Sequence, residues 1–237
     1  MGKSFFITGT GTDIGKTIAT GFLYFTLNKL GLKTTVFKPF QTGLIEQTQT
    51  YPDLDWFSSV IGVSNAGFYA LEPEASPHLA IKLQGAKVNI EAVLHRLKEL
   101  EQTNDIVLVE GAGGLAVPLI EREDDFYMTK DFIKEANMPA ILVSPSGLGS
   151  IHDVLTTNQY ANHYDIPIQL LFFNRFEETN PIHLDNIETI KRIVQLPALA
   201  IPFFEDLKNE LERYSESCIQ SESFKKQIKE VFIHGTR

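Results

Sequence analysis

A turn rich in glycine and threonine near the start of the chain constrains its possible folds more than any other sequence feature. An apolar run at Ser4–Thr8 precedes this turn, which spans Gly9–Thr17, and apolar residues then recur with helical spacing over Lys16–Leu30. The short apolar run predicts a buried strand, and the periodic segment predicts an amphipathic helix. The sequence therefore predicts a strand, a tight loop and a helix in succession.

The remainder of the chain continues this alternation. Gly31 can end the first helix in the left-handed conformation, and Thr34–Lys38 predicts a second strand that Pro39 should stop. Further strands are expected at 105–110, 139–144, 168–174 and 196–201, and helices at 91–100 and 128–136. A long loop is expected at 41–54 and terminal helices at 210–227. This alternation predicts an α/β fold, a doubly wound and mostly parallel sheet with helices on both faces.

The length and the composition are typical of a single soluble domain. With 237 residues, 43% of them hydrophobic and 22% charged, we expect a single domain over residues 1–237, with C-terminal helices from about residue 206. The net charge of −9 argues against nucleic acid as a partner. Cys218 is the only cysteine, and no apolar run suits a signal peptide or a membrane span. A cytoplasmic location is therefore expected.

The glycine- and threonine-rich turn is typical of a loop that binds phosphate groups. Its small residues leave backbone N–H groups free to converge on phosphate oxygens at the N-terminus of the next helix. Lys16 adds a positive charge, and the Thr17 hydroxyl is placed to bind a Mg²⁺ ion that bridges nucleotide phosphates. Five residues separate Gly9 from Gly15, where the usual P-loop has four, so the motif is a variant.

Charged residues follow two predicted strands, at the sheet edge where ligands bind in parallel sheets. Lys38 ends the second strand and is either functional or a solvated surface charge. Glu110 ends an apolar strand and precedes three glycines and an alanine, which allow a ligand to approach closely. Its carboxylate could hold Mg²⁺ or simply be exposed. Asp53 and Asp55 could likewise bind metal or cap a helix.

Two further polar segments have both a structural and a functional interpretation. Ser76-Pro77-His78 is typical of a rigid turn before a helix, and a lone histidine such as His78 is more often a surface residue than a base. Asn174 ends a predicted strand, where its amide could pair with a nucleotide base or stabilise a turn. From these residues alone, both interpretations stay open.

Four segments together resemble the family of ATP-dependent dethiobiotin synthetases. They are Gly9-Thr10-x-Thr12-x-x-Gly15-Lys16-Thr17, Lys38-Pro39-x-x-Thr42-Gly43, Ser76-Pro77-His78 and Val109-Glu110-Gly111-Ala112-Gly113-Gly114. The second and fourth segments are more specific than the phosphate loop alone. Order and spacing both fit over residues 4–204, whereas the stretch after Glu205 matches no family pattern.

The resemblance implies an enzyme of biotin biosynthesis that uses ATP and Mg²⁺. This family carboxylates 7,8-diaminononanoate with CO₂ and closes a cyclic urea, dethiobiotin, through a carbamate and a carbamic-phosphoric anhydride. It has the three-layer fold of P-loop NTPases and works as a homodimer with substrate at the subunit interface. A homodimer is therefore expected, with small molecules as ligands and with neither nucleic acid nor membrane as a partner.

The resemblance also implies roles for individual residues. The catalytic residues would be Lys38, Lys16 and Thr12. The metal ligands would be Thr17, Glu110 and Asp55, the last in preference to Asp53. The nucleotide-binding residues would be Asp13, Ile14, Gly15, Lys16, Thr17, Ile18, Asp55, Glu110, Gly111, Ala112, Gly113, Asn174, Arg175, Pro202 and Phe203. The substrate would be bound by Thr42, Ser76, Pro77 and His78.

The sequence departs from the family pattern at several positions. Asp13 replaces an expected Glu, and Gly11 replaces a polar residue, both of which look tolerable. Gly147 stands where the family commonly has a basic residue, and Arg175 stands where an Asp helps to recognise adenine. We expect contacts to the substrate carboxylate or the partner subunit, and the preferred base, to differ here.

Two other protein classes share parts of this pattern. A ParA/MinD-like ATPase switch would carry a lysine five residues before Lys16, where this chain has Gly11. An amide-forming synthetase of the same superfamily would add a glutaminase domain with a catalytic cysteine, and Cys218 lies too near the end to head one. Both classes fit the sequence less well than the dethiobiotin synthetases.

Overall fold

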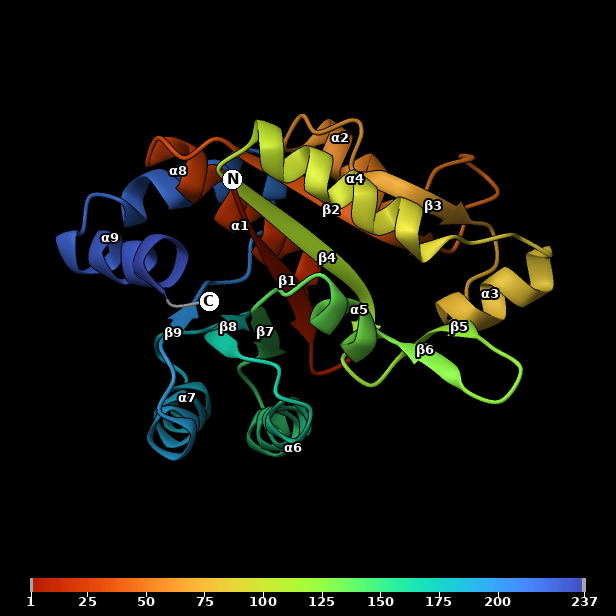
Figure 1. Ribbon diagram of the computed structural model, residues 1–237. Coiled ribbons are helices and arrows are strands. Elements are labelled where there is room, and N and C mark those ends of the chain that lie inside the picture. The colour runs from red at the N-terminus through yellow and green to blue at the C-terminus, as the bar shows by residue number, and fades with distance from the viewer. Residues whose placement is uncertain (1, 236–237) are drawn as a thin grey trace.

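A seven-stranded parallel sheet forms the centre of the protein (Figure 1). The computed structural model describes residues 2–235. The strands run in the order β3-β2-β4-β1-β7-β8-β9, and each neighbouring pair is parallel. Their bounds are β1 Lys3–Gly9, β2 Thr34–Thr42, β3 Gly67–Leu71, β4 Ile106–Gly114, β7 Ala140–Pro145, β8 Ile168–Asn174 and β9 Ala198–Ala200. The predicted doubly wound α/β fold is confirmed.

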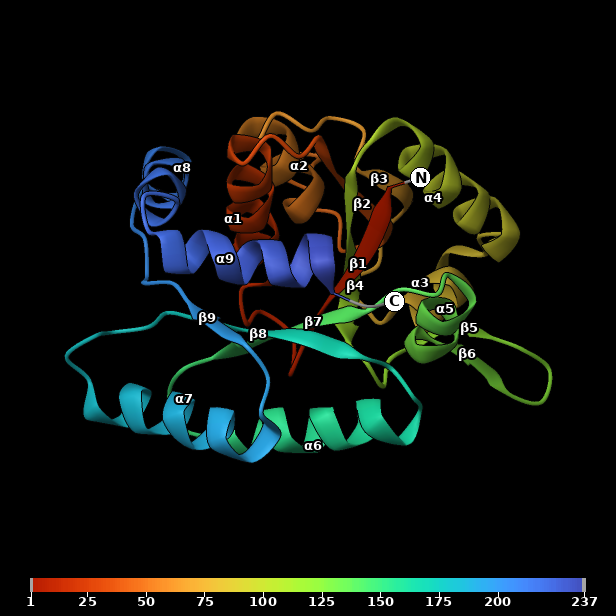
Figure 2. The same cartoon turned by 60° about the vertical axis from the view of Figure 1, so that its left-hand side comes forward.

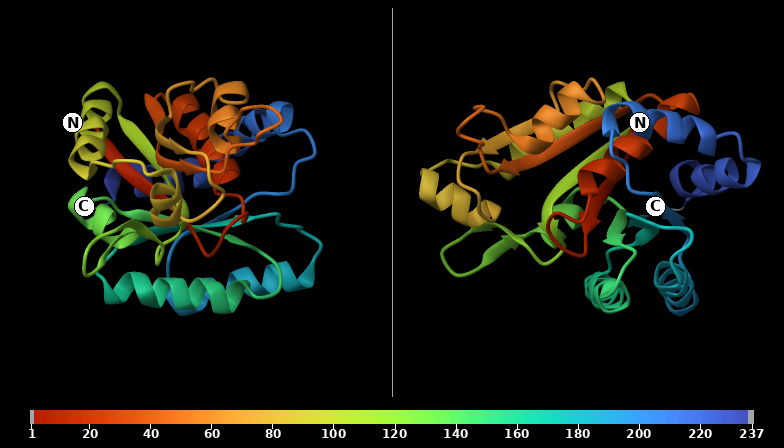
Figure 3. Two further views of the ribbon diagram at one scale, coloured as in Figure 1. Left: turned by 90° about the vertical axis from the view of Figure 1, so that its right-hand side faces the viewer. Right: turned by 180° about the vertical axis from the view of Figure 1, so that it is seen from behind.

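Helices cover both faces of this sheet (Figures 2 and 3). One face carries α1 Lys16–Lys29, α2 Pro52–Ser59, α8 Leu207–Cys218, α9 Glu222–Lys229 and the π-helical turn η1 Glu230–His234. The other face carries α3 Pro77–Gln84, α4 Ile90–Thr103, α5 Thr129–Glu135, α6 Ser150–His163 and α7 Pro181–Val194. Figure 2 shows α6 and α7 below the sheet, with α1 and α2 above it. Within residues 2–235, no helix has the length and apolar character that crossing a membrane requires.

Strand β1 shows why a central strand of this sheet is apolar at nearly every position. Phe5 and Ile7 belong to the core on the α1 face, and Phe6 belongs to the core on the opposite face. All three are at most 2% exposed. Side chains alternate between the two faces of a strand, and helices cover both faces here. A continuous apolar run is therefore what this position requires.

The prediction that Pro39 stops the second strand was wrong, because β2 continues to Thr42. β2 pairs with β4 up to Phe37 and with β3 from Lys38 onward. The Lys38 N–H donates to the carbonyl of Ala66, on the β3 side. Successive N–H groups of a strand point to opposite sides, so the position of Pro39 faces the side where pairing with β4 has ended. Proline is tolerated there.

Strand β4 also differs from its predicted length, because it continues past Glu110 to Gly114. Gly111 permits this course, since a Cβ at this position would lie 2.6 Å from the ring of Phe6. The glycines after Glu110 thus serve the packing of β4 against β1 as well as the open edge beyond it.

Several elements were not predicted. β3 and the antiparallel hairpin of β5 Pro118–Glu121 and β6 Phe126–Met128 are short and partly exposed, so their sequences lack a strong apolar pattern. β9 is shorter than the predicted 196–201. The long loop expected at 41–54 is confined to residues 43–51, because β2 and α2 extend into its two ends.

The C-terminal helices complete the core on the α1 face. The ring of Phe232 in η1 is buried, and its centroid lies 4.6 Å from that of Phe5 in β1. Leu211 of α8 packs on α1 where Gly21 leaves room, since a Cβ at Gly21 would lie 3.2 Å from Cδ2 of Leu211. The helices predicted near the end of the chain are therefore part of the folded core.

Replacing Phe232 by alanine should destabilise the protein by about 3–5 kcal/mol, because it opens a cavity against β1. Ile193→Ala on α7 is a suitable control, since that side chain is 56% exposed and its loss should change the free energy of unfolding by less than about 0.5 kcal/mol. Urea unfolding followed by circular dichroism measures both values. If Phe232→Ala changed the free energy of unfolding as little as Ile193→Ala, η1 would lie outside the cooperatively folding core.

Candidate functional site

The strand ends identified from the sequence meet around one cavity of about 1140 Å³. It lies at the carboxyl ends of β1, β2 and β4, and its walls include the loop after β2 and the segment before α3. The predicted site residues that line it are Thr12, Asp13, Gly15, Lys16, Thr17, Ile18, Lys38, Thr42, Ser76, Pro77, Glu110, Ala112 and Gly113. Residues far apart in the sequence are therefore brought together here.

The loop between β1 and α1 presents the start of a helix to this cavity. Gly15 is the N-cap of α1 with a φ of +93°, and no described side chain caps the first turn. The first N–H groups of a helix have no partner inside it and are available to an anion. Glycine is required at this position, because a Cβ would lie 1.7 Å from Nδ2 of Asn174. Lys16 Nζ donates to the carbonyl of Gly11 at 3.1 Å and so stays within the loop.

Lys38 lies between two carboxylates at the base of the cavity. Its Nζ donates to Asp53 Oδ2 at 2.6 Å and to Glu110 Oε1 at 2.8 Å. The Lys38 and Glu110 side chains are 3% and 0% exposed, so neither is a solvated surface charge. Charges buried to this degree persist only when they are paired and hydrogen-bonded. The two carboxylates therefore fix the position of the ammonium group.

The pairing also sets the charge state of the cluster. Burial alone would lower the pKa of the Lys38 ammonium, but the charges of Glu110 and Asp53 outweigh burial and raise that pKa. Burial alone would raise the pKa of the Asp53 carboxyl, yet Lys38 and a hydrogen bond from Thr17 hold it below its ordinary value. The pKa of Lys16 is lowered, chiefly by burial and further by the charge of Lys38. Lys38 and Asp53 are thus held as an ion pair.

The hydroxyl of Thr17 adds a third oxygen to this cluster. Thr17 Oγ1 lies 2.9 Å from Asp53 Oδ1 and 3.1 Å from Glu110 Oε1. The three side chains come from α1, α2 and β4, respectively. Oxygen donors of this kind are the ligands that small divalent cations prefer. These residues could therefore hold such a cation next to the phosphate loop.

The structure brings Asp53, rather than the preferred Asp55, into the cluster. Helix α2 begins at Pro52 and its N-cap is Tyr51, so neither aspartate caps the helix. Residues two apart do not share a face of a helix. Asp53 faces Thr17, whereas Asp55 is exposed and does not line the cavity. The preference for Asp55 is therefore corrected to Asp53.

The segment before α3 has the structural role that its sequence indicated. Ser76 is the N-cap of α3, and Pro77 is its first residue. His78 lies behind this wall, with Nδ1 3.1 Å from the Ser76 Oγ and its ring against that of Phe126. Ser76 and Pro77 thus line the cavity, whereas His78 stands next to it.

Asn174 ends β8 beside the phosphate loop. Its Nδ2 donates to the carbonyl of Ile14 at 3.3 Å, and its Oδ1 accepts a hydrogen bond from the backbone N–H of Arg175 at 2.9 Å. Arg175 is exposed and has a left-handed φ of 56°. The amide of Asn174 therefore fastens β8 to the loop.

The predicted residues outside the wall of the cavity are Ile14, Asp55, His78, Gly111, Asn174, Arg175, Pro202 and Phe203.

Thr20, which was not predicted from the sequence, contacts the cluster from α1. Its Oγ1 lies 2.6 Å from Glu110 Oε2, and both side chains are fully buried. Helical periodicity was the available signal, because residues four apart share a face and Thr20 follows Lys16 by four. Glu72 and Glu74 line the cavity as well and were not predicted.

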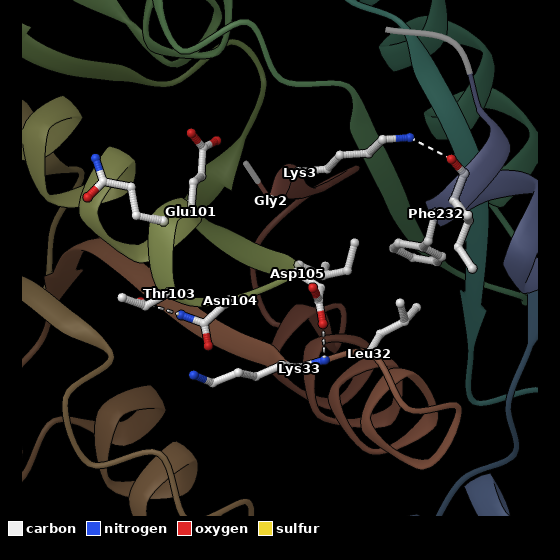
Figure 4. A pocket seen from close by; sticks show the side chains of 12 residues that line it. Gly2, Lys3, Leu32, Lys33, Glu101, Thr103, Asn104, Asp105 and Phe232 are labelled. Atoms are coloured by element: carbon white, nitrogen blue, oxygen red, sulfur yellow. Dashed lines mark hydrogen bonds between the residues drawn. The ribbon is translucent and has the colours of Figure 1, made fainter.

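A second pocket lies at the opposite, amino-terminal ends of the strands (Figure 4). Its volume is about 410 Å³, and its lining includes the turn η1. Lys3 Nζ donates to the carbonyl of Ile233 at 2.7 Å, and Asp105 Oδ2 accepts a hydrogen bond from the backbone N–H of Lys33 at 2.8 Å. These polar groups join chain segments to one another, so we assign this pocket a structural role.

Comparison with known sequences finds a matching family model and named relatives. A family model described as an AAA domain matches residues 3–211. An ATP-dependent dethiobiotin synthetase of Geobacillus sp. (strain WCH70) is 50% identical over 201 residues, which cover 84% of each chain. A protein of the same name from Staphylococcus epidermidis is 38% identical over 192 residues, which cover 80% of this chain and 85% of the relative.

Solved structures show the fold at lower sequence identity. The MinC:MinD cell division complex of Aquifex aeolicus has a TM-score of 0.59 and 18% identity, covering 99% of this chain and 97% of that chain. A ParA family ATPase from Chlorobium tepidum has a TM-score of 0.53 and 15% identity, covering 97% of each chain. These likenesses concern the fold alone, whereas the identity to the synthetases extends over most of the chain. The chain belongs to the AAA-domain family and, within it, to the family of ATP-dependent dethiobiotin synthetases.

Proposed function

We propose that this chain is an ATP-dependent cyclo-ligase that makes dethiobiotin from 7,8-diaminononanoate and CO₂ in biotin biosynthesis. The observation that carries the proposal is the position of Lys38, which the buried Glu110 carboxylate and the partly buried Asp53 carboxylate hold beside a phosphate-binding loop. The synthetases of Geobacillus and Staphylococcus, by their names, support the same reaction. ATP and small organic molecules are then the ligands of the cavity.

The reaction forms two new C–N bonds at the expense of one ATP. One amine of the substrate attacks CO₂, loses a proton and becomes a carbamate. A carbamate oxygen then attacks the γ-phosphorus of ATP, ADP leaves, and a carbamic-phosphoric anhydride forms. The second amine attacks the carbonyl carbon of this anhydride, phosphate leaves, and the ring closes with loss of a second proton. Phosphorylation is needed because a carbamate is itself a poor electrophile.

Phosphoryl transfer between two anions requires positive charge more than it requires a base. Lys16 supplies an ammonium group within the phosphate loop, and Lys38 supplies one at the base of the same cavity. Thr12 lines the cavity from the loop and is assigned to the same step. Because little water surrounds buried groups, their charges act on the migrating phosphoryl group with less screening than in solution.

The cluster of oxygens fits a bound Mg²⁺ ion. Octahedral Mg²⁺ with ligand distances of about 2.0–2.1 Å sets neighbouring ligand oxygens about 2.9 Å apart. Thr17 Oγ1 lies 2.9 Å from Asp53 Oδ1 and 3.1 Å from Glu110 Oε1. Among residues 2–235 no three His, Cys, Asp or Glu side chains form a metal site, so phosphate oxygens would complete the coordination. When bound, the ion would neutralise charge on the nucleotide phosphates.

We assign residues to the adenine base of ATP and to the diamine from the family resemblance and from their positions. The resemblance assigns adenine to Asn174, which lies beside the phosphate loop with its amide hydrogen-bonded to Ile14 and Arg175, and to Arg175, Pro202 and Phe203 near the same strand ends. The diamine is assigned to the wall formed by Thr42, Ser76 and Pro77, and His78 contacts this wall through Ser76.

We further propose a homodimer that acts in the cytoplasm. Leu148 is 88% exposed in the loop before α6, and Leu184 on α7 is 49% exposed. A partner subunit packed against these two elements would remove both side chains from water. The single cysteine, Cys218, is free, as is usual in a reducing compartment.

ATP hydrolysis should depend on the diamine. Phosphate release measured with Mg²⁺ and ATP should rise when diaminononanoate and bicarbonate are added, because the carbamate is the acceptor of the phosphoryl group. Mass spectrometry should detect one dethiobiotin for each phosphate released. Hydrolysis that does not respond to the diamine would refute the proposed reaction.

Lys38→Ala should lower kcat by at least about 10²-fold, because positive charge at the migrating group is lost. Nucleotide affinity, measured by calorimetry, should change little because Lys16 remains. The unpaired carboxylates should lower stability by about 3–5 kcal/mol, so both assays are run below the unfolding transition. Lys82→Ala is the control, since Lys82 is 64% exposed and pairs with Glu121 at the surface. Loss of ATP binding in the Lys38 variant would place this residue in the phosphate site instead.

Asp53→Asn should raise the Mg²⁺ concentration needed for half-maximal activity by at least about tenfold, because a metal ligand loses its charge. Asp55→Asn provides a control on the same helix and should leave the Mg²⁺ requirement unchanged. A titration of initial rate against Mg²⁺ concentration at saturating ATP compares the two. A shift confined to the Asp55 variant would return the metal site to that residue.

A further inference from the structure

Thr20 makes a buried contact that the proposed reaction does not yet explain. It lies on α1, one turn beyond Lys16, and its side chain is 0% exposed. Its Oγ1 lies 2.6 Å from Glu110 Oε2 and 2.9 Å from the carbonyl oxygen of Lys16. Both neighbouring atoms are acceptors, whereas a hydroxyl has only one hydrogen to donate. The Thr20 hydroxyl can therefore donate its hydrogen to only one of these two oxygens.

The carboxylate is the stronger acceptor of the two. The Lys16 carbonyl already accepts the backbone N–H of Thr20 in the regular pattern of the helix. Hydrogen bonds to charged oxygens are shorter and stronger than those to neutral oxygens, and the contact with Glu110 is the shorter one here. The single hydrogen of Thr20 is therefore donated to Oε2 of Glu110.

This bond determines where the other oxygen of Glu110 points. With Oε2 held by Thr20, Oε1 faces Thr17 Oγ1 at 3.1 Å and Lys38 Nζ at 2.8 Å. Glu110 is fully buried, so water does not surround it to take the place of a lost donor. Without Thr20, Oε2 would lose this partner and the carboxylate could rotate about its last side-chain bonds.

We propose that Thr20 is a positioning residue that orients the Glu110 carboxylate toward the divalent cation of the active site. This inference rests on the proposed function, because it takes the oxygen cluster to be the metal site. Helix α1 then serves the site with three residues on one face: Lys16 for phosphate, Thr17 for metal, and Thr20 for the orientation of the second metal ligand.

Thr26 provides a matched comparison on the same helix. It is a second threonine of α1 that is 0% exposed, and its Oγ1 has no hydrogen-bond partner among the described residues. Removal of the hydroxyl at Thr26 tests the general effect of a threonine-to-valine change in a buried turn of α1. Only removal of the hydroxyl at Thr20 also releases Glu110.

The test measures Mn²⁺ binding by calorimetry in the presence of a non-hydrolysable ATP analogue, for the unaltered chain and for Thr20→Val, Thr20→Ser and Thr26→Val. Thr20→Val should bind Mn²⁺ about tenfold more weakly, as expected when the partner of a metal ligand is lost. Thr20→Ser keeps the hydroxyl and should restore most of the affinity. Thr26→Val should bind Mn²⁺ as the unaltered chain does. The Mg²⁺ concentration for half-maximal activity should be highest for Thr20→Val. For Thr20→Ser and Thr26→Val it should lie close to that of the unaltered chain.

Equal Mn²⁺ affinity in Thr20→Val and the unaltered chain would overturn the inference, even if the variant melted at a lower temperature. If Thr20→Val does not fold, Thr20→Ala and Thr20→Ser answer the same question, because they differ only in the hydroxyl. Equal Mn²⁺ affinity of Thr20→Ala and Thr20→Ser would also overturn the inference. Failure of the unaltered chain to bind Mn²⁺ would instead refute the metal assignment on which the inference rests, and dependence of ATP hydrolysis on the diamine tests the reaction separately.

Discussion

The ion cluster of the buried Lys38 and Glu110 with the partly buried Asp53 is the interaction on which this end of the molecule depends. An ammonium group that is removed from water must be balanced by opposite charge, and α2 and β4 each supply one carboxylate to β2. Thr17 and Thr20 bind the same carboxylates from α1. The contacts that hold these four elements together are therefore the same contacts that form the proposed active site.

The order of the strands explains why these residues meet. In a parallel sheet all carboxyl ends lie at one edge, and β4 stands between β1 and β2 although it follows them in sequence. Glu110 consequently enters the space between the phosphate loop and Lys38. A site assembled in this way consists of residues that are remote in sequence, and it forms only when β1, β2 and β4 are correctly ordered.

Local sequence patterns predicted much of this architecture, because central strands buried on both faces are continuous apolar runs and because glycine marks the phosphate loop and the end of α1. The partly exposed β3 and the hairpin of β5 and β6 lack such a pattern and were missed.

Other features depend on parts of the chain that are distant in sequence. Strand β2 continues past Pro39 because its pairing changes there from β4 to β3. Asp55 was preferred to Asp53 from the family resemblance. The start of α2 at Pro52, which the sequence did not reveal, decides which aspartate faces the cluster. Thr20 was missed because its partner, Glu110, is distant in sequence.

The most direct test of the central claim is a crystal structure of the protein with Mg²⁺, a non-hydrolysable ATP analogue and the diamine. We expect a metal ion about 2.0–2.1 Å from oxygens of Thr17 and Glu110, with Asp53 at the same ion and the γ-phosphate beside Lys38. A metal ion bound through Asp55, or a γ-phosphate remote from Lys38, would contradict it.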